Sequence, residues 1–398
     1  MSSNSVPINK HKKYRYPWRS GGHFQILIDG PQFYPVMLDA IASATNFIFL
    51  ETYLMESGRI TDRFVSELIK AHQRGVKIYI LLDDYGSYYL KVEDRQRLWE
   101  GGIQLVFYNP TSFHKMYQNL FRNHRKLLLV DNKLAFVGGA GLSDDFMQPS
   151  HSVTNWHEVM LQVEGPVIQD WFDLFSRTWQ LATQSPCPIS ASQSKSLVED
   201  QLGRVSIAEG FGRQEINRSL IKRCRSAERR IWISTPYFII SRKLRHILHR
   251  AARHGIDVRV LVPGPISDHP WVGHASRGYY TRLLRQGVRI FEYQPRFLHA
   301  KILLCDTWVS IGSSNLDRWN QHWNLDANQE VDDPRFATRI EALFLKNFSQ
   351  SIEISFQDWV IRSRWQRLRE WFWGRFVHLL EVVGRRHLQK RKRKRKTK

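Results

Sequence analysis

The chain has 398 residues, of which 42% are hydrophobic and 13% aromatic, which is enough for large cores and excludes a disordered protein. The formal net charge of +22 favours an anionic partner, such as phospholipid head groups, nucleic acid or polyphosphate, without choosing among them. Cys187, Cys224 and Cys305 lack metal-type or CxxC spacing. We therefore expect no disulfide framework and a reducing cytoplasm.

Residues 1–21 are expected to be an N-terminal extension, because they contain no apolar core of signal-peptide length. No run elsewhere in the chain approaches the roughly 18 uncharged apolar residues that a membrane span needs. The sequence therefore predicts a soluble or peripheral protein.

The remainder of the chain contains an internal repeat. Apolar strand-like stretches occur in the same order in both halves, at 46–53, 76–82 and 102–108 and again at 229–237, 256–262 and 287–293. Helix-like segments separate them, so we expect a duplicated α/β unit with mostly parallel sheets. A Ser- and Pro-rich stretch, 184–204, is the predicted linker between domain 1 (22–183) and domain 2 (205–355).

Each half then carries a His-x-Lys-x4-Asp motif, formed by His124, Lys126 and Asp131 in the first half and by His299, Lys301 and Asp306 in the second. Residues two apart on a strand point to the same face, so each His and its Lys are expected to project into one site. The Asp is either a site carboxylate or a turn residue at the end of the strand, and the Asp131-Asn132 pair favours the turn.

Small residues follow each motif strand, in Gly138-Gly139-Ala140-Gly141-Leu142-Ser143 and in Gly312-Ser313-Ser314-Asn315. Small residues let a phosphate approach backbone N–H groups, and Ser and Asn add donors. Gly139, Ser313 and Asn315 are therefore candidate phosphate-binding residues.

Two histidines and two lysines around one phosphate suffice for a transfer reaction. One imidazole attacks phosphorus to give a covalent phosphohistidine, and the other protonates the leaving alcohol and deprotonates the incoming one. The lysines neutralise the phosphoryl oxygens. No cluster has metal-ligand spacing, so we expect neither a metal nor a cofactor. Glu158 and Asp326, downstream of the motifs, are either the carboxylates that orient the imidazoles or surface salt-bridge partners.

The doubled motif resembles the hallmark of the phospholipase D superfamily over about residues 22–355. Within it the chain is similar to bacterial cardiolipin synthases of the short form, without N-terminal membrane spans. Segments that carry this likeness include Leu50-Glu-Thr-Tyr53, Leu82-Asp-Asp-Tyr-Gly-Ser87, Val163-Glu-Gly-Pro166 and Ile311-Gly-Ser-Ser-Asn-Leu-Asp317.

The resemblance implies two tandem phospholipase D-like α/β/α sandwich domains that meet at one active site. It also implies His124 as nucleophile, His299 as general acid, and transfer of a phosphatidyl group to phosphatidylglycerol, which gives cardiolipin. Two residues depart from the family pattern: Gly141 stands where Asn is usual, and Asp326 where Glu is usual.

Residues 356–389 are expected to form an amphipathic membrane-associating helix, with an apolar stripe through Trp365, Phe372 and Leu379. Four tryptophans suit interfacial depth, namely Trp359, Trp365, Trp371 and Trp373. In the basic tail, 390–398, eight of the nine residues are Lys or Arg. A cationic run beside an apolar stripe is typical of an anchor to anionic membranes. A helix packed on the core and a nucleic-acid-binding tail are the alternatives.

We therefore expect a phosphatidyl transferase at the cytoplasmic face of the bacterial inner membrane, bound peripherally. Its expected partners are phosphatidylglycerol, cardiolipin and the membrane surface, and not nucleic acid. A phospholipase D hydrolase or a nuclease of the same superfamily is the alternative, because a positive field also suits a nucleic-acid backbone.

Overall fold

A computed structural model of the chain describes residues 13–147, 155–190, 200–210, 212–317 and 323–363, together with Trp365 and Trp373. The elements of the first half are β1 (Arg19–Ile28), α1 (Gly30–Ala42), β2 (Phe47–Thr52), α2 (Arg59–Gln73), β3 (Lys77–Asp83), α3 (Val92–Glu100), β4 (Gln104–Tyr108), the 3-10 helix η1 (Phe113–Leu120), β5 (Arg122–Asn123), β6 (Lys126–Val130), β7 (Leu134–Gly138), the 3-10 helix η2 (Asp144–Phe146), β8 (Trp156–His157), β9 (Val159–Glu164) and α4 (Ile168–Thr183).

The second half repeats this order with different loop lengths. Its elements are β10 (Gln201–Glu209), α5 (Glu215–Ser226), β11 (Arg230–Ser234), α6 (Arg242–Arg253), β12 (Asp257–Pro263), α7 (Pro270–Arg277), α8 (Tyr280–Leu284), β13 (Arg289–Tyr293), β14 (Phe297–Leu298), β15 (Ile302–Cys305), β16 (Trp308–Gly312), β17 (Asn324–Asp332), α10 (Pro334–Ser349), β18 (Ser351–Glu353) and α11 (Phe356–Ile361). β10 begins inside the predicted linker, because composition alone does not mark where the chain rejoins a sheet.

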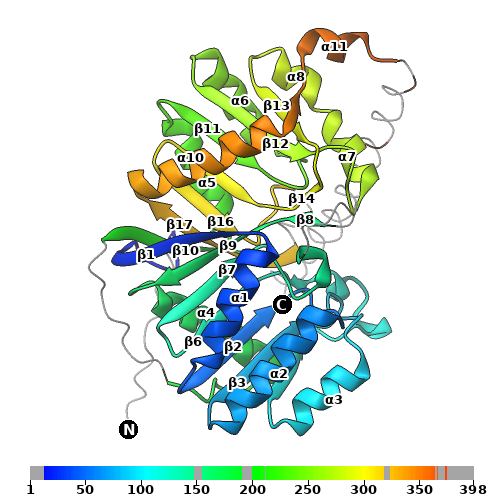
Figure 1. Cartoon of the computed structure of the whole chain (residues 1–398). Helices are drawn as coiled ribbons and strands as arrows, with labels where there is room; N and C mark the ends of the chain where they lie inside the picture. The colour runs from blue at the N-terminus through cyan, green and yellow to red at the C-terminus, as the bar shows by residue number, and fades with distance from the viewer. Residues whose placement is uncertain are drawn as a thin grey trace, which may run out of the picture.

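The strands of both halves form one continuous sheet. Its order is β18-β13-β12-β11-β15-β16-β17-β10-β1-β9-β7-β6-β2-β3-β4, and β5 pairs with β17 away from this path. The order on one side of the β1·β10 junction mirrors the order on the other, and Figure 1 shows the two halves meeting there. This arrangement confirms the α/β class and the duplicated unit.

The expectation of mostly parallel sheets is wrong in detail. Each half contains one parallel trio, β2-β3-β4 or β11-β12-β13, and the neighbouring strands on the path are antiparallel. The motif strand β6 turns back into β7 after only Asp131, Asn132 and Lys133, and a turn this short can join only antiparallel strands. Both strands of this hairpin are buried, so their sequences read like the apolar runs of parallel strands.

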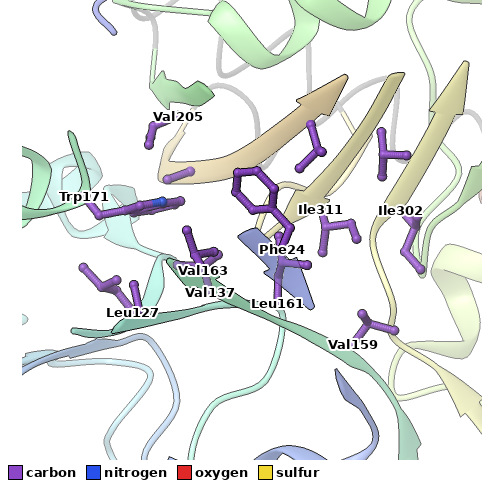
Figure 2. Close-up of a cluster of buried hydrophobic side chains, with 14 of the residues drawn as sticks. Phe24, Leu127, Val137, Val159, Leu161, Val163, Trp171, Val205, Ile302 and Ile311 are labelled. Carbon is purple, nitrogen blue, oxygen red and sulfur yellow. The ribbon is translucent and has the colours of Figure 1, made fainter. Parts of the chain in front are cut away.

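A single hydrophobic core crosses from one half to the other. Figure 2 shows Phe24 of β1, Val163 of β9 and Trp171 of α4 beside Val205 of β10 and Ile311 of β16. Helices α4 and α10 contribute to this shared core. On the other face, α1, α2 and α3 cover the first half, and α5, α6 and α8 cover the second. Each half is therefore an α/β/α sandwich, and the halves cannot separate without exposing shared core.

The structure reaches only the start of the predicted C-terminal helix. α11 ends at Ile361, where Arg362 takes an extended backbone, so no continuous helix runs through this point. Trp359, expected at the membrane interface, is instead 8% exposed: it packs on Tyr280 and donates a hydrogen bond to Thr281 Oγ1 at 3.0 Å. Most of segment 356–389 and the whole basic tail lie outside the described residues. Among the described helices, none has the length and apolar character to span a bilayer.

Candidate active site

The two motifs lie at the same edge of their parallel strands. Strand β6 runs antiparallel to β2, with Lys126 opposite Thr52, the last residue of β2. In the second half Ile302, next to Lys301, lies opposite Ser234, the last residue of β11. Both His-x-Lys segments therefore lie at the carboxyl ends of the parallel strands, the edge at which α/β sheets usually bind ligands.

Short strands exchanged between the halves bring the motifs to their carboxylates. In the first half β5, just before the motif, pairs in parallel with β17 of the second half, and the His124 N–H donates to the Leu325 carbonyl at 2.9 Å. Conversely, β14 of the second half pairs with β8 of the first, and the His299 N–H donates to the His157 carbonyl at 2.9 Å. Each histidine is therefore held beside the carboxylate-bearing segment of the opposite half.

Each imidazole contacts one buried carboxylate through its Nδ1. His124 Nδ1 lies 3.0 Å from Asp326 Oδ1, and His299 Nδ1 lies 2.5 Å from Glu158 Oε2. Asp326 is 0% exposed and Glu158 1% exposed, so neither is the surface salt-bridge partner that the sequence left open. A carboxylate accepts from Nδ1–H, which leaves the Nε2 lone pair of each ring available for phosphorus or for a proton.

The two lysines are buried beside the rings. Lys126 Nζ donates to the His124 carbonyl at 2.6 Å and lies 5.3 Å from the centre of the Tyr53 ring. Lys301 Nζ donates to the His299 carbonyl at 2.6 Å and to Glu158 Oε2 at 3.3 Å. It also lies 2.8 Å from His299 Nδ1 and 2.9 Å from His299 Nε2, so its charge lies against the imidazole ring and disfavours a second positive charge there.

Burial and mutual repulsion set the protonation of these groups. Burial, with the charge of the adjacent lysine, lowers the pKa of His124 and of His299 to about 4. Burial and the charge of Lys301 lower the pKa of Lys126 to about 7. Burial raises the pKa of Glu158, but Lys301 and His299 outweigh it, so this carboxyl stays ionised at neutral pH. Both imidazoles are therefore neutral at neutral pH without substrate, as a nitrogen nucleophile must be.

The small-residue turns differ between the halves in a compensating way. A Cβ on Gly139 would lie 2.1 Å from Glu158 Oε2, so only glycine leaves room for this long side chain. At the equivalent position of the second half, Ser313 Oγ donates to Asp326 Oδ1 at 2.7 Å and accepts from the Ala327 N–H at 3.2 Å. The small residue and the carboxylate therefore compensate in size: Gly139 accommodates the longer Glu158 in the first pair, and Ser313 accompanies the shorter Asp326 in the second.

Gly141, the position at which the family usually has Asn, is explained by packing. A Cβ on Gly141 would lie 2.4 Å from the Leu54 carbonyl oxygen, and the Gly141 carbonyl accepts from the Tyr34 hydroxyl at 2.7 Å. An asparagine therefore has no room at this position. Asn315, its counterpart, is buried, and no described residue donates to its Oδ1.

The motif aspartates lie at the far end of their strands. Asp131 accepts hydrogen bonds from the backbone N–H groups of Thr45, Asn46 and Phe47, at 2.7–3.0 Å. Asp306 accepts equivalent bonds from residues 228–230, at 2.9–3.0 Å. Of the two interpretations of these aspartates, a site carboxylate or a turn residue, this geometry favours the turn residue, because each aspartate holds the start of the neighbouring strand.

Sequence reasoning missed the residues that hold Glu158. Asp29 has a left-handed φ of 64°, its N–H donates to the Glu158 carbonyl at 2.9 Å, and its Oδ1 accepts from the Glu158 N–H at 3.2 Å. The same Oδ1 lies 2.9 Å from His157 Nδ1, and Arg296 of the second half donates to Oδ2. Because His157 also accepts from the His299 N–H, Asp29 connects both members of the His299–Glu158 pair.

A second network fixes the approach to His124. Asp83 Oδ2 accepts from the Asn123 N–H at 2.8 Å, and Oδ1 lies 3.3 Å from the Arg122 guanidinium. Asn123 Nδ2 donates to Glu51 Oε1 at 2.7 Å. All four side chains are buried. The signal in the sequence was a charged residue closing an apolar strand, as at Glu51 and Asp83, which usually marks a site when it is buried.

Comparison with known proteins decides the family. The chain matches the family model described as cardiolipin synthase, PLD-like domain (PLD denotes phospholipase D), over residues 37–179 and 220–348, once in each half. The chain belongs to this family.

Cardiolipin synthase A of Pseudomonas putida is 30% identical to this family member over 358 residues, which cover 89% of this chain and 74% of the relative. Cardiolipin synthase B of Salmonella typhi is 34% identical over 328 residues, which cover 80% of this chain and 78% of that protein. In fold, the chain is similar to the crystal structure of phosphatidylserine synthase from Haemophilus influenzae, with a TM-score of 0.71, 12% identity and coverage of 90% and 94%. As a member of the cardiolipin synthase family, the chain is a phosphatidyltransferase of the phospholipase D superfamily.

Proposed function

We propose that the chain makes cardiolipin from two molecules of phosphatidylglycerol through a covalent phosphohistidine, at the cytoplasmic face of the bacterial inner membrane. The observation that carries the proposal is the exchanged pair of contacts, His124 with Asp326 and His299 with Glu158, in one buried site between two lysines. It supplies a nucleophile and a separate acid, which a two-step transfer requires.

In the first step Nε2 of His124 attacks phosphorus of one phosphatidylglycerol. The N–P bond forms as the bond to the glycerol oxygen breaks, and His299 gives its proton to that oxygen, so free glycerol leaves. Asp326 stabilises the positive charge that develops on His124. The anionic phosphodiester raises the pKa of the neighbouring His299, because an imidazolium is favoured beside a negative charge, and so equips it as an acid.

In the second step the terminal hydroxyl of another phosphatidylglycerol attacks the phosphohistidine. His299, now neutral, takes the hydroxyl proton, the N–P bond breaks, and cardiolipin leaves with His124 restored. Lys126 and Lys301 neutralise charge on the phosphoryl oxygens in both steps, and because the site is buried each charge acts with little screening by water.

The site is symmetric enough that the order of the two histidines needs its own experiment. The full chain is incubated with phosphatidylglycerol labelled at phosphorus, in mixed micelles, and denatured in base, where a phosphohistidine survives. With His124 as nucleophile, His299→Ala retains some label and His124→Ala retains none. The reverse pattern exchanges the two roles, and absence of label from the wild type during turnover contradicts a covalent intermediate.

Product analysis separates the alternatives. Mass spectrometry of the lipids is expected to show cardiolipin and an equal amount of glycerol, lost in both histidine variants and retained in His246→Ala, on the exposed face of α6. Phosphatidic acid in place of cardiolipin would mean that water is the acceptor, as in a hydrolase. Digestion of plasmid or RNA by wild type, with the lipids unchanged, would establish the nuclease.

A further inference from the structure

Two loops at the carboxyl edge of the first half display large apolar side chains. One loop, 84–91, follows β3, and the other, 109–121, follows β4. We call the exposed members the apolar rim: they are Tyr85, Tyr88, Tyr89, Phe113 and Met116, with between 63% and 101% of each residue accessible. Single exposed apolar residues are ordinary, but five on two adjoining loops mark an interaction surface.

The rim is built on a fixed support. The backbone N–H and the hydroxyl of Thr111 both donate to Asp84 Oδ2, at 2.8 and 2.7 Å, and so join one loop to the other. Within the second loop Asn109 Nδ2 donates to the carbonyls of Gln118 and Phe121, both at 2.8 Å. These bonds fix the conformation of the two loops that carry the apolar side chains. Little further conformational entropy is therefore lost when the loops bind a partner.

The same support leads directly to the catalytic strand. Arg122 donates to the Asn109 carbonyl at 2.9 Å and lies 3.3 Å from Asp83 Oδ1. The other oxygen of Asp83 accepts from the Asn123 N–H, and the next residue is His124. The rim and His124 therefore share one hydrogen-bonded frame, and the rim lies at the edge of the sheet that carries the two motifs.

We propose that the apolar rim inserts into the head-group region of a phospholipid bilayer and so places the opening of the active site on the lipid surface. This inference rests on the proposed function, in which both substrates are two-tailed lipids. Tyrosine suits this depth, because its ring is apolar and its hydroxyl stays hydrated. Lys91 and Lys115 are the only cationic side chains among the rim loops, and Asp84 offsets one of them, so insertion depends on apolar burial.

A bilayer fits this position better than a second copy of the chain. A phosphodiester within a bilayer lies at head-group depth, so the opening must meet the lipid surface for phosphorus to reach His124. A second copy seated on the rim would cover the edge through which lipid enters. The rim also differs in kind from the basic tail, 390–398, whose attraction to anionic lipid is coulombic and therefore screened by salt.

The test compares the full chain with the variant Tyr88→Ser/Tyr89→Ser/Phe113→Ser/Met116→Ser. The matched control is Trp99→Ser, which removes an aromatic residue that is 51% exposed at the end of α3, on the opposite edge of the same half. Co-sedimentation with vesicles of phosphatidylglycerol and phosphatidylcholine is measured at about 0.5 M salt, where the Debye length is only about 4 Å. We expect the rim variant to bind at least about tenfold more weakly than wild type, and the control to bind equally.

Turnover provides the second measurement. Short-chain phosphatidylglycerol, used below its micelle concentration, needs no surface, so the rim variant is expected to retain its rate on this substrate and to lose rate on vesicles. Unchanged vesicle binding, or an equal loss on both substrates, overturns the proposal, as does a rim variant that only dissociates an oligomer. If wild type turns over neither substrate the proposed function fails, whereas vesicle binding still tests the rim.

Discussion

The fit between Gly139 and Glu158 makes a sharp quantitative prediction. In Gly139→Ser the new Cβ would lie 2.1 Å from Glu158 Oε2, the atom that contacts His299 Nδ1 at 2.5 Å. The carboxylate must withdraw by about 1 Å, and a misplacement of this size costs about 10²-fold in rate, or about 2.7 kcal/mol of transition-state stabilisation. Glu158→Asp withdraws the same oxygen by one methylene and is expected to cost a similar factor.

The double variant Gly139→Ser/Glu158→Asp distinguishes a steric from an independent effect. Once the carboxylate is shorter the serine has room, as Ser313 has beside Asp326, so the loss should stay near 10²-fold. The assay is the rate of cardiolipin formation from phosphatidylglycerol in mixed micelles, with urea unfolding of each variant as a control for stability. Ser313→Gly, which removes the hydroxyl and its hydrogen bonds to Asp326 and Ala327 without a clash, is expected to cost about fivefold. A double variant slower by about 10⁴-fold, the product of two independent losses, would refute the steric reasoning.

Further predictions concern titration, positioning and stability. Because the pKa of Lys126 is lowered to about 7, kcat/KM should fall more steeply above about pH 7, where this lysine loses its charge. Lys126→Arg keeps its charge and should remove this change of slope, so an unchanged profile assigns the slope to another group. Asp29→Asn should lower kcat by about tenfold with KM nearly constant, and an effect confined to KM would contradict a role in positioning the His299 pair. Asp131→Ala should lower the free energy of unfolding by about 1–3 kcal/mol in urea melts while kcat is retained, and loss of activity in a fully folded variant would restore the catalytic interpretation. Gly141→Asn should destabilise the fold without any gain in rate, which thermal unfolding and the micelle assay would measure together.

The local part of the site was predictable from the sequence. An extended chain with a period of two places each His on the same side as its Lys, although His124 and His299 lie just before β6 and β15 and not on these strands, and the following glycines and serines indicate the turns. Nothing local, however, shows that Glu158 serves His299 of the other half. That contact depends on β8 pairing with β14, a pairing of two residues on each side.

The difference between local signals and contacts between distant segments also explains the errors in the predicted fold. Alternating strands and helices gave the α/β class and the duplication, because both follow from periodicity. The direction of β6 relative to β2 does not, since a strand buried on both faces reads alike in either direction. Trp359 was assigned to a membrane interface from its spacing, yet a tryptophan on an amphipathic segment fits a protein core equally well, and here it contacts Tyr280. The predicted domain boundaries and the anchoring role of the C-terminal segment stay predictions.

The exchange of carboxylates between the halves means that neither half carries both members of either histidine–carboxylate pair. A fragment that ends before β10 would carry His124 without Asp326, and the complementary fragment would carry His299 without Glu158. Two such fragments could work only as an obligate heterodimer, docked through β1·β10 and the shared core. Genetic complementation follows the same logic: a chain defective at Glu158 and one defective at Asp326 cannot rescue each other, unless they exchange whole halves.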